Sequence, residues 1–508
     1  MNTAVPILLA LLASLSPLLT LTWLWQIKEW RIDRLREHLR SEGCFRQLLG
    51  PVRPATVLTL FVLGILLPHV RQSWHLLALA ALGILGLAQF ATKRQRVPVW
   101  TQKAKVLFMC ALTLTLLIAY VWQYSHPTLL VVLPLIQSWI LGLSWVIFLP
   151  VDSLLKNRRM QRASALRDTF QDLTVIGITG SAGKTTLKEL LACVLSSRDV
   201  LTTPAYVNSE MGVANWMLSQ LSLRKESPPE LLIVEMGAYR KGEIARLCAI
   251  AKPTLGAITF IGKQHMALFG SQETLSAAKA ELLESLPVEG KAFLNADNNA
   301  SVAVAKKAAC PVVLVGTGGH ADVEAFDIEE TASGIVFREG DTRFAVPLHG
   351  THNVTNVLLA IAIARELGMN NKEIASALTH YVPPSHTFSV RTEKGIQILD
   401  DTHNASPASF KAAMSWARMQ PATLKVLLTS GLIELGQEQD LIHTELGEVA
   451  TKTFDRVIFM NARSGRFFEK GFGKPIEIYS PTLPPLTDKS LLVCIGRVPS
   501  GAIHHLLS

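Results

Sequence analysis

The stretch GITGSAGKTTLKELL, from Gly177 to Leu191, decides the fold of the second half of the chain. It follows a β-prone apolar run, Leu173–Ile178, and leads into Thr186–Ser196, where apolar residues recur at helical spacing. Strand, glycine-rich loop and helix in this order form a phosphate-binding loop, although the strict pattern has glycine where Ile178 stands. We predict a nucleotide site made of Gly180, Ser181, Ala182, Gly183, Lys184, Thr185 and Thr186.

The sequence before this loop is apolar enough for a membrane. A bilayer core needs about 20 apolar residues in a helix, and residues 1–150 contain five segments without Lys, Arg, Asp or Glu. Four of them are long enough and the second is short. We predict an α-helical membrane domain of about five transmembrane helices, in preference to buried helices of a soluble core. The segments are Pro6–Trp25, Ala55–Val70, Trp74–Thr92, Val106–Gln123 and Thr128–Pro150.

Basic residues occupy every second connection between these segments, at 28–53, 93–105 and 156–167. Cytoplasmic loops carry such an excess, which places the N-terminus outside and everything after Pro150 in the cytoplasm, with the chain multi-pass in the inner membrane. Residues 1–167 have a net charge of +13 and the remainder −4. The basic excess is therefore juxtamembrane and favours anionic lipid, so it gives no argument for nucleic acid. Six cysteines without a CxxC pair suit a reducing cytoplasm.

The remaining sequence alternates strand-like and helix-like segments, which indicates two α/β regions with mostly parallel sheets. The sequence YVPPS, Tyr381–Ser385, interrupts the alternation, and we place a domain boundary near Pro383. The predicted organisation is a basic cytoplasmic linker at 151–170, a central P-loop domain at 171–383 and a C-terminal Rossmann-like domain at 384–508. Strands are expected at Leu231–Glu235, Leu255–Ile261, Lys291–Asn295, Ile396–Asp400, Lys425–Thr429, Arg456–Met460 and Ser490–Ile495.

Glu235 ends the apolar run LLIVEMG at the C-terminal edge of a predicted strand, where a carboxylate can reach the magnesium of a bound nucleotide. Around it, eight ordered blocks resemble the Mur ligases, and within them the MurF type, over roughly Thr174 to Gly447. The blocks are TGSAGKTTLKEL, NSEMGV, VEMGAYRKGEIARL, HMALFGSQETLSAAKAE, FLNADN, LHGTHNVTN, and ILDDTHNASP with GLIELGQEQDLIHTELG.

The resemblance implies an ATP-dependent ligase that phosphorylates a carboxylate and lets an amine attack the acyl phosphate. It implies that Lys184 holds the β- and γ-phosphates and that Thr185 and Glu235 bind a first magnesium. His265 resembles the ligand of a second magnesium, and Lys279 lies at the spacing of the family's carbamylated lysine. A carbamate is an anionic oxygen ligand of the kind that magnesium prefers, whereas a bare lysine is a cation.

Other matching positions imply contacts with the nucleotide. Asn295 resembles the residue that contacts adenine, and Asn353 and Asn356 match a block near the nucleotide. Asp401 and Asn404 match a segment of the C-terminal domain that meets ATP when the domains close. His403 stands where tyrosine is usual.

The chain also departs from the family pattern. His386 stands where the family has an arginine that reaches the phosphates, with Arg391 some way beyond, and Leu432 replaces an aspartate. The membrane segments occupy the place of a uridine-nucleotide-binding domain.

The acceptor therefore stays open: a nucleotide-linked muramyl peptide, a lipid-linked precursor, or the substrate of a folylpolyglutamate-like or poly-γ-glutamate ligase. The donor is an amino acid or dipeptide, and a membrane-protein partner of the spans is a further expectation. A nucleotide-binding regulatory protein with degenerate catalysis is the alternative from another class, and a single nucleotide loop argues against an ABC transporter.

Overall fold

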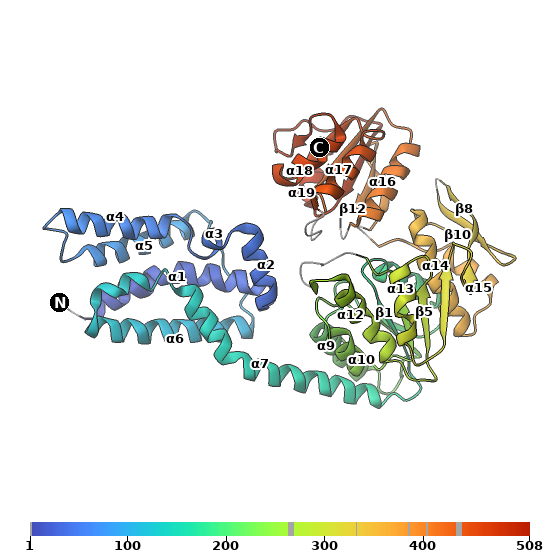
Figure 1. Ribbon diagram of the computed structural model, residues 1–508, viewed down its shortest axis with the longest axis horizontal. Helices are drawn as coiled ribbons and strands as arrows, with labels where there is room; N and C mark the ends of the chain where they lie inside the picture. Colours follow the sequence, from blue (N-terminus) through green and yellow to red (C-terminus); the bar gives the residue numbers. More distant parts are fainter. Residues whose placement is uncertain (1–2, 263–268, 332, 385–386, 403–404, 433–438) are drawn as a thin grey trace. The chain divides into compact units, whose positions relative to one another are not determined.

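A computed structural model of the chain describes residues 3–262, 269–331, 333–384, 387–402, 405–432 and 439–508 (Figure 1). It divides into two compact units, Met1–Asn157 and Arg158–Ser508. The boundary falls inside helix α7, Gln137–Asp168. The segment 151–170, expected as a linker, is therefore mostly the second half of a continuous helix, which runs through Pro150.

The described part of the N-terminal unit is helical. Four of its helices are long and apolar enough to cross a membrane by length and composition, namely α1, α5, α6 and α7. The expected second span forms α4 with only 15 residues, about 22 Å of helix against a hydrocarbon core of about 30 Å. The elements are α1 Ala4–Ile27, α2 Ile32–Glu42, α3 Cys44–Leu48, α4 Val52–Leu66, α5 Trp74–Ala91, α6 Gln102–Ser125, the 3₁₀ helix η1 Pro127–Val132, and α7.

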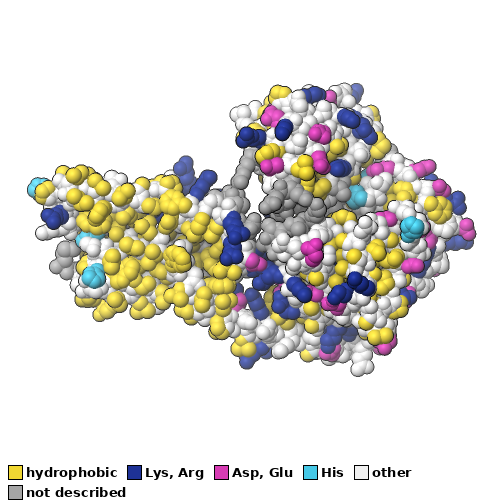
Figure 2. Space-filling view, viewed as in Figure 1, with side chains coloured by type: hydrophobic (Ala, Val, Ile, Leu, Met, Phe, Trp, Pro, Cys, Tyr) yellow, Lys and Arg dark blue, Asp and Glu magenta, His cyan; other side chains and the backbone are white. Residues whose placement is uncertain are grey.

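Small residues let α1 and α5 approach closely. A Cβ added at Gly83 would lie 3.2 Å from Leu12, and one added at Gly86 would lie 3.1 Å from Ser16. Glycine at helix contacts is the usual means of tight packing between apolar helices. The Ser16 hydroxyl donates to Gln89 Oε1 at 2.8 Å, so a polar group inside this unit has a partner. Apolar side chains cover the outer face of the unit (Figure 2).

The second unit begins with a seven-stranded parallel sheet in the order β2-β3-β1-β4-β5-β6-β7. Its strands are β1 Thr174–Thr179, β2 Val200–Thr202, β3 Leu231–Glu235, β4 Leu255–Ile258, β5 Lys291–Asn295, β6 Val312–Gly316 and β7 Val323–Glu324. Its helices are α8 Lys184–Val194, α9 Glu210–Leu223, α10 Glu243–Ala251, α12 Gln272–Glu284, α13 Asn299–Val304, α14 Val354–Glu366 and α15 Asn371–Leu378, with short 3₁₀ turns η2 Ala305–Lys307 and η3 Thr351–Asn353.

Side chains of β1 alternate between the two faces of this sheet, as the two-residue period of a strand requires. Ile176 and Ile178 pack in one core with α8 and α14, while Val175 packs in the other with α9, α10 and α12. Both faces are covered by helices, and the loop after β1 lies at the carboxyl edge of the sheet, where sheets of this kind bind their ligands.

A three-stranded antiparallel sheet, which the sequence analysis does not predict, extends the first of these cores. Its strands are β8 Phe326–Thr331, β9 Gly334–Glu339 and β10 Thr342–Val346, in the order β10-β9-β8. Phe337 and Phe344 stack with centroids 5.5 Å apart, and both are buried with Ile335 and Val346 in the core that contains α8 and α14.

The C-terminal sheet has the order β11-β12-β16-β13-β14-β15, antiparallel at β11 and parallel elsewhere. The expected strands agree with β12, β13, β14 and β16 to within one residue. Its elements are β11 Ser389–Glu393, β12 Ile396–Asp401, α16 Pro407–Met419, β13 Leu424–Thr429, α17 Gln439–Ala450, β14 Arg456–Phe459, α18 Ala462–Phe472, β15 Glu477–Ile478, β16 Ser490–Ile495 and α19 Ser500–Leu506. Cores on both faces of the sheet make this a Rossmann-like layer arrangement.

Candidate active site

The predicted phosphate-binding loop lies between β1 and α8 as expected. β1 ends at Thr179 and α8 begins at Lys184, so the loop Gly180–Gly183 precedes the helix N-terminus directly. The loop is held by the segment that follows β4, because Ser181 N donates to Phe260 O at 2.6 Å and the Thr259 hydroxyl donates to Ala182 O. The Lys184 ammonium folds back and donates to Gly180 O at 2.9 Å.

Two glycines of the loop cannot be replaced without strain. Gly180 has φ +151° and Gly183 has φ +82°, conformations that residues with a Cβ rarely adopt. A Cβ at Gly180 would collide with the Thr259 hydroxyl, and a Cβ at Gly183 would lie 2.5 Å from Asn356 Oδ1. The loop therefore packs against Asn356 of α14, which is one of the residues predicted to contact the nucleotide.

Thr185 and Glu235 meet at the end of the loop. The Thr185 hydroxyl donates to Glu235 Oε2 at 3.0 Å, and Asn208 Nδ2 donates to Glu235 Oε1 at 3.2 Å. Glu235 is 4% exposed, so it is not a solvated strand-end carboxylate. Asn208 lies in the NSEMGV block, but the sequence analysis gives it no role.

This pair fits a magnesium ion bound together with a nucleotide. A hydroxyl and a carboxylate are hard oxygen ligands, and Mg²⁺ usually takes only one or two carboxylates and completes its shell with phosphate oxygens and waters. Within the described ranges no group of three His, Cys, Asp or Glu side chains is arranged to hold a metal ion. A magnesium ion bound to this pair would take its remaining ligands from phosphate oxygens and waters.

Lys279 lies on α12 and is 3% exposed. Burial and the nearby Lys184 ammonium lower the pKa of Lys279 to about 7, while the carboxylates of Glu243 and Glu281 act in the opposite direction. A lysine of a helix surface would remain an ammonium at neutral pH. Lys279 instead has a large neutral fraction there, which is the form that can act as a nucleophile toward carbon dioxide.

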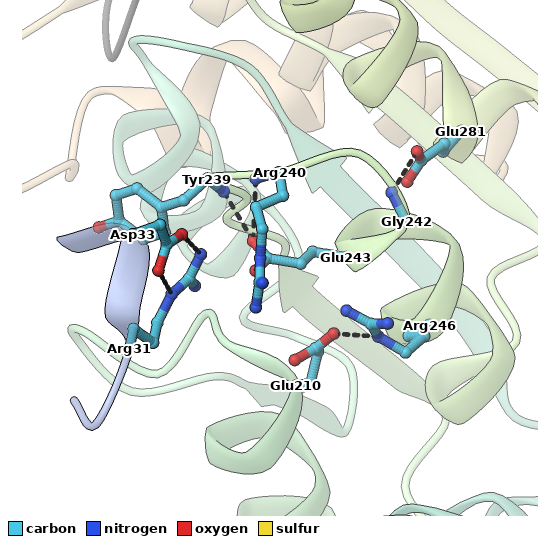
Figure 3. Close-up of polar contacts among 9 residues, drawn as sticks. All are labelled: Arg31, Asp33, Glu210, Tyr239, Arg240, Gly242, Glu243, Arg246 and Glu281. Carbon is cyan, nitrogen blue, oxygen red and sulfur yellow. Dashed lines mark hydrogen bonds and ion pairs between the residues drawn. The ribbon is translucent and has the colours of Figure 1, made fainter. Parts of the chain in front are cut away.

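Glu281 joins α12 to the N-terminus of α10 (Figure 3). Its carboxylate accepts from Gly242 N at 2.6 Å and from Ala245 N at 3.0 Å. Glu243 turns back and accepts from Tyr239 N at 2.7 Å, which closes the loop after Glu235. The first turn of a helix leaves N–H groups without intrahelical partners and favours negative charge. Two buried carboxylates, neither assigned a role from the sequence, therefore fix the surroundings of Lys279.

The three predicted nucleotide asparagines lie around the loop, bonded to the protein. Asn356 Nδ2 donates to Asn353 Oδ1 at 2.9 Å, and Asn353 Nδ2 donates to His349 O at 2.8 Å. Asn295 Nδ2 donates to Thr259 O at 2.9 Å, which links the end of β5 to the residue that contacts the loop. The adenine contact of Asn295 stays a prediction.

Asp401 lies at the end of β12 and is 4% exposed. Its Oδ1 accepts from Phe388 N at 3.2 Å, and Oδ2 is buried without a hydrogen-bond partner among the described residues. Burial raises the pKa of Asp401 to about 6, and the charge of Asp400 adds to this. Phe388 stacks on His349 with centroids 5.8 Å apart. A chain of contacts thus runs from Asp401 to His349 and on to the loop.

Several predicted positions cannot be placed. His265, His386, His403 and Asn404 lie outside the described residues. Arg391, which lies beyond His386 in sequence, pairs with the buried Asp400 at 2.9 Å, so its side chain supports the sheet. Leu432 is buried in the C-terminal core, and its backbone N donates to His443 Nε2 at 3.0 Å.

Part of the chain is similar to a known protein family. Residues 178–364 match the Mur ligase middle domain. The UDP-N-acetylmuramoyl-tripeptide–D-alanyl-D-alanine ligase of Mycobacterium tuberculosis (strain H37Rv) is 38% identical over 293 residues, which cover 55% of this chain and 56% of that protein. The Bacillus subtilis ligase of the same name is 31% identical over 308 residues, or 60% of this chain and 66% of that one. The chain therefore spans roughly half to two thirds of the length of these relatives.

The fold has a counterpart among solved structures. MurF from Acinetobacter baumannii superposes with a TM-score of 0.62 over 69% of this chain and 80% of that one, at 24% sequence identity. At this identity the likeness shows the fold.

A P-loop and a threonine–glutamate pair at the edge of one parallel sheet, followed by a second, mostly parallel sheet, define a P-loop α/β fold. The sequence matches reported above are more specific than the fold. Residues 178–364 match the Mur ligase middle domain, and the chain is similar to Mur ligases of the UDP-N-acetylmuramoyl-tripeptide–D-alanyl-D-alanine type.

Proposed function

We propose that this chain is an ATP-dependent peptide ligase that joins an amino acid or dipeptide to a carboxylate of a cell-envelope precursor. The observation that carries the proposal is the meeting of Lys184, the Thr185–Glu235 pair and the buried Lys279 around one loop. The relatives that the chain resembles are ligases of a UDP-N-acetylmuramoyl-tripeptide and D-alanyl-D-alanine. D-alanyl-D-alanine is therefore the first donor to test.

The proposed reaction has two steps. A carboxylate oxygen of the acceptor attacks the γ-phosphorus of ATP, which gives an acyl phosphate and ADP. The donor amine then attacks the acyl carbon, the amide bond forms, inorganic phosphate leaves and the nitrogen loses a proton. Lys184 and the loop N–H groups bind the phosphate oxygens and stabilise the charge that is transferred. Bound magnesium supplies further neutralisation of the phosphates, and Thr185 and Glu235 hold it.

Lys279 takes part as a carbamate in this proposal. Its neutral amine would add to carbon dioxide and lose a proton, and the resulting carbamate, together with His265, would supply ligands for a second magnesium. The support in the structure is the burial of the amine and its pKa of about 7. Asn295, Asn353, Asn356 and Asp401 are proposed to contact the nucleotide, and closure of the C-terminal domain would exclude water from the labile acyl phosphate.

The N-terminal unit is proposed to lie in the cytoplasmic membrane with the catalytic unit in the cytoplasm. Tryptophans and cations meet in this unit as they do at a membrane–water interface. The Arg96 guanidinium lies 5.2 Å from the Trp23 ring centre, and the Lys103 ammonium lies 5.8 Å from that of Trp30. Trp25 and Trp145 are in contact nearby, with centroids 5.2 Å apart.

The acceptor is proposed to be associated with the membrane, as a lipid-linked precursor, because the spans stand where a nucleotide-binding domain is expected. A soluble nucleotide-linked peptide is the alternative. Two other candidates are a polyglutamate-type ligase and a regulatory protein without ligase activity. The regulatory protein is favoured by Leu432, which stands where the family pattern has an aspartate. The family's arginine is also replaced, at His386.

The test is product formation by the full chain in lipid nanodiscs. The reaction contains ATP, Mg²⁺, isotope-labelled D-alanyl-D-alanine or L-glutamate, and either UDP-N-acetylmuramoyl-tripeptide or a bacterial lipid extract. We expect phosphate release and a labelled product by mass spectrometry, and neither with Lys184→Ala. Lys252→Ala, which changes an exposed lysine paired with Asp168, is the control. Wild-type turnover by Lys184→Ala would exclude the ligase assignment, and label from glutamate alone would favour the polyglutamate type.

A further inference from the structure

Lys188 is a buried cation one helical turn after the phosphate-binding lysine. It lies on α8, which begins at Lys184, and its side chain has no exposed surface. Taking an ammonium group out of water costs several kcal/mol unless it is paired and hydrogen-bonded. A position of α8 that only needed packing would be better occupied by an apolar residue. The charge at Lys188 therefore calls for a function.

The contacts of the Lys188 ammonium lead to Glu235. It donates to Thr203 O at 2.7 Å and lies 3.2 Å from Glu189 Oε1 and 3.8 Å from Glu235 Oε2. Thr203 is buried as well, and its hydroxyl accepts from the backbone N of Glu235 at 3.0 Å. Lys188 and Thr203 thus support the main chain and the side chain of the same glutamate.

Both carboxylate oxygens of Glu235 are approached by groups of fixed position. Oε2 has the Thr185 hydroxyl at 3.0 Å and the Lys188 ammonium at 3.8 Å, and Oε1 has Asn208 Nδ2 at 3.2 Å. The main chain of Asn208 is itself held, because its backbone carbonyl oxygen accepts from Gly237 N at 2.8 Å. These contacts leave the carboxylate a single orientation, turned toward Thr185.

We infer that Lys188 is a positioning residue that holds Glu235 in the orientation in which it binds magnesium with Thr185. The inference rests on the proposed role of Glu235 and Thr185 in binding the metal of Mg²⁺·ATP. Groups that orient metal ligands typically change metal affinity 10- to 100-fold when they are removed. Lys188 touches neither metal nor nucleotide, so its effect passes through Glu235.

The test measures metal binding, separately from activity. Full-length protein in nanodiscs is titrated with Mn²⁺ in the presence of ADP, and bound Mn²⁺ is measured by electron paramagnetic resonance. Lys188→Met removes the charge at similar volume. Lys188→Gln is the second variant, because its amide can still donate to Thr203 O and so preserves the packing of α8. We expect both to weaken Mn²⁺ binding by about 10- to 100-fold, with ADP affinity in the absence of metal within about threefold of wild type.

Two controls separate positioning from general structure. Glu189→Gln changes the other carboxylate beside Lys188, whose side chain is 36% exposed, and should leave Mn²⁺ binding within about twofold. In a Glu235→Gln background, Lys188→Gln should cause no further loss, because the residues act as one unit. The inference would be overturned if Lys188→Gln bound Mn²⁺ as tightly as wild type. It would also be overturned if Lys188→Gln weakened Mn²⁺ binding as much in the Glu235→Gln background as it does in the wild-type background. If wild-type protein binds no Mn²⁺ with ADP, the proposed metal site itself is wrong.

Discussion

At the scale of single residues, the amine of Lys279 combines near-complete burial with a pKa of about 7. Only the neutral amine reacts with carbon dioxide, so carbamate formation should decline as pH falls below 7 and the ammonium form takes over. Wild-type protein incubated with ¹³C-labelled bicarbonate at pH 8 should show a carbamate signal by nuclear magnetic resonance. Lys279→Ala should lack this signal and lose at least about 100-fold in ligation.

Short carboxylates such as acetate should restore part of the activity of Lys279→Ala, because they can fill the vacant anionic position. Lys307→Ala serves as the control, since Lys307 is an exposed lysine paired with Glu284. Full activity of Lys279→Ala in buffer depleted of carbon dioxide would contradict the carbamate assignment.

The raised pKa of Asp401 leads to a second prediction at this scale. The folded-state pKa is about 6 against an ordinary value of 3.8. The folded protein therefore binds the proton more tightly than the unfolded chain, and this stabilisation is present at low pH and is lost as pH rises through 6. Asp401→Asn has no carboxyl group that must ionise in the folded state. At pH 7.5 its free energy of unfolding should therefore be up to about 3 kcal/mol higher than that of wild type.

The gain in Asp401→Asn should fall to a small remainder near pH 4, where the carboxyl is protonated in the folded state and, with its ordinary pKa of 3.8, about half protonated in the unfolded chain. Denaturant titrations at the two pH values measure the difference. Asp341→Asn, in the exposed turn between β9 and β10, is the control for the substitution itself. Ligation by Asp401→Asn should fall, because a residue kept buried at a cost in stability is expected to serve the bound nucleotide. Equal stability of Asp401→Asn and wild type at pH 7.5 would refute the prediction.

At the scale of elements, Glu281 connects α12 and α10, and this contact determines where Lys279 lies. Glu281→Ala leaves two backbone N–H groups of the α10 N-terminus without an acceptor. We expect a loss of about 1–3 kcal/mol in unfolding free energy. The ligation rate should fall by more than the loss of folded protein alone would explain, because α12 carries Lys279.

Glu284→Ala is the matched control on the same helix. Glu284 forms an exposed ion pair with Lys307 at 3.0 Å, and such pairs contribute about 0–1 kcal/mol. Thermal unfolding followed by circular dichroism compares the two variants. If Glu281→Ala is as stable and as active as Glu284→Ala, the carboxylate does not position α12.

Elements and site residues differ in how far the sequence could predict them. The P-loop and Glu235 were predictable because strand, loop and helix follow one another directly in the sequence. Lys188, Thr203 and Glu281 were not, because their function depends on contacts between elements 30 to 50 residues apart in the chain. The sheet β8–β10 was missed because the inward residues of its strands join a core that distant helices define.

At the scale of the whole molecule, the two units have separate hydrophobic cores. The N-terminal core lies within residues 10–141, and the cores of the other unit lie beyond residue 162. Arg167 belongs to the second unit by its contacts, since its guanidinium donates to Phe170 O at 2.6 Å and to Leu173 O at 2.9 Å. A cut that removes Arg167 would leave these buried carbonyl groups unpaired, whereas a cut after Asn157 keeps them.

Removal of residues 1–157 therefore tests what the apolar helices contribute. We expect the remaining chain to be soluble and folded and to bind ATP with an affinity close to that of the full chain, because the P-loop, Glu235 and Lys279 belong to one core region. Ligation of a membrane-associated acceptor should be lost, since several apolar helices exceed what anchoring requires. The measurements are nucleotide binding by calorimetry and product formation with a lipid extract or with UDP-N-acetylmuramoyl-tripeptide. Turnover of the soluble peptide at the full-length rate would show that the helices serve only as an anchor and that the acceptor does not depend on them.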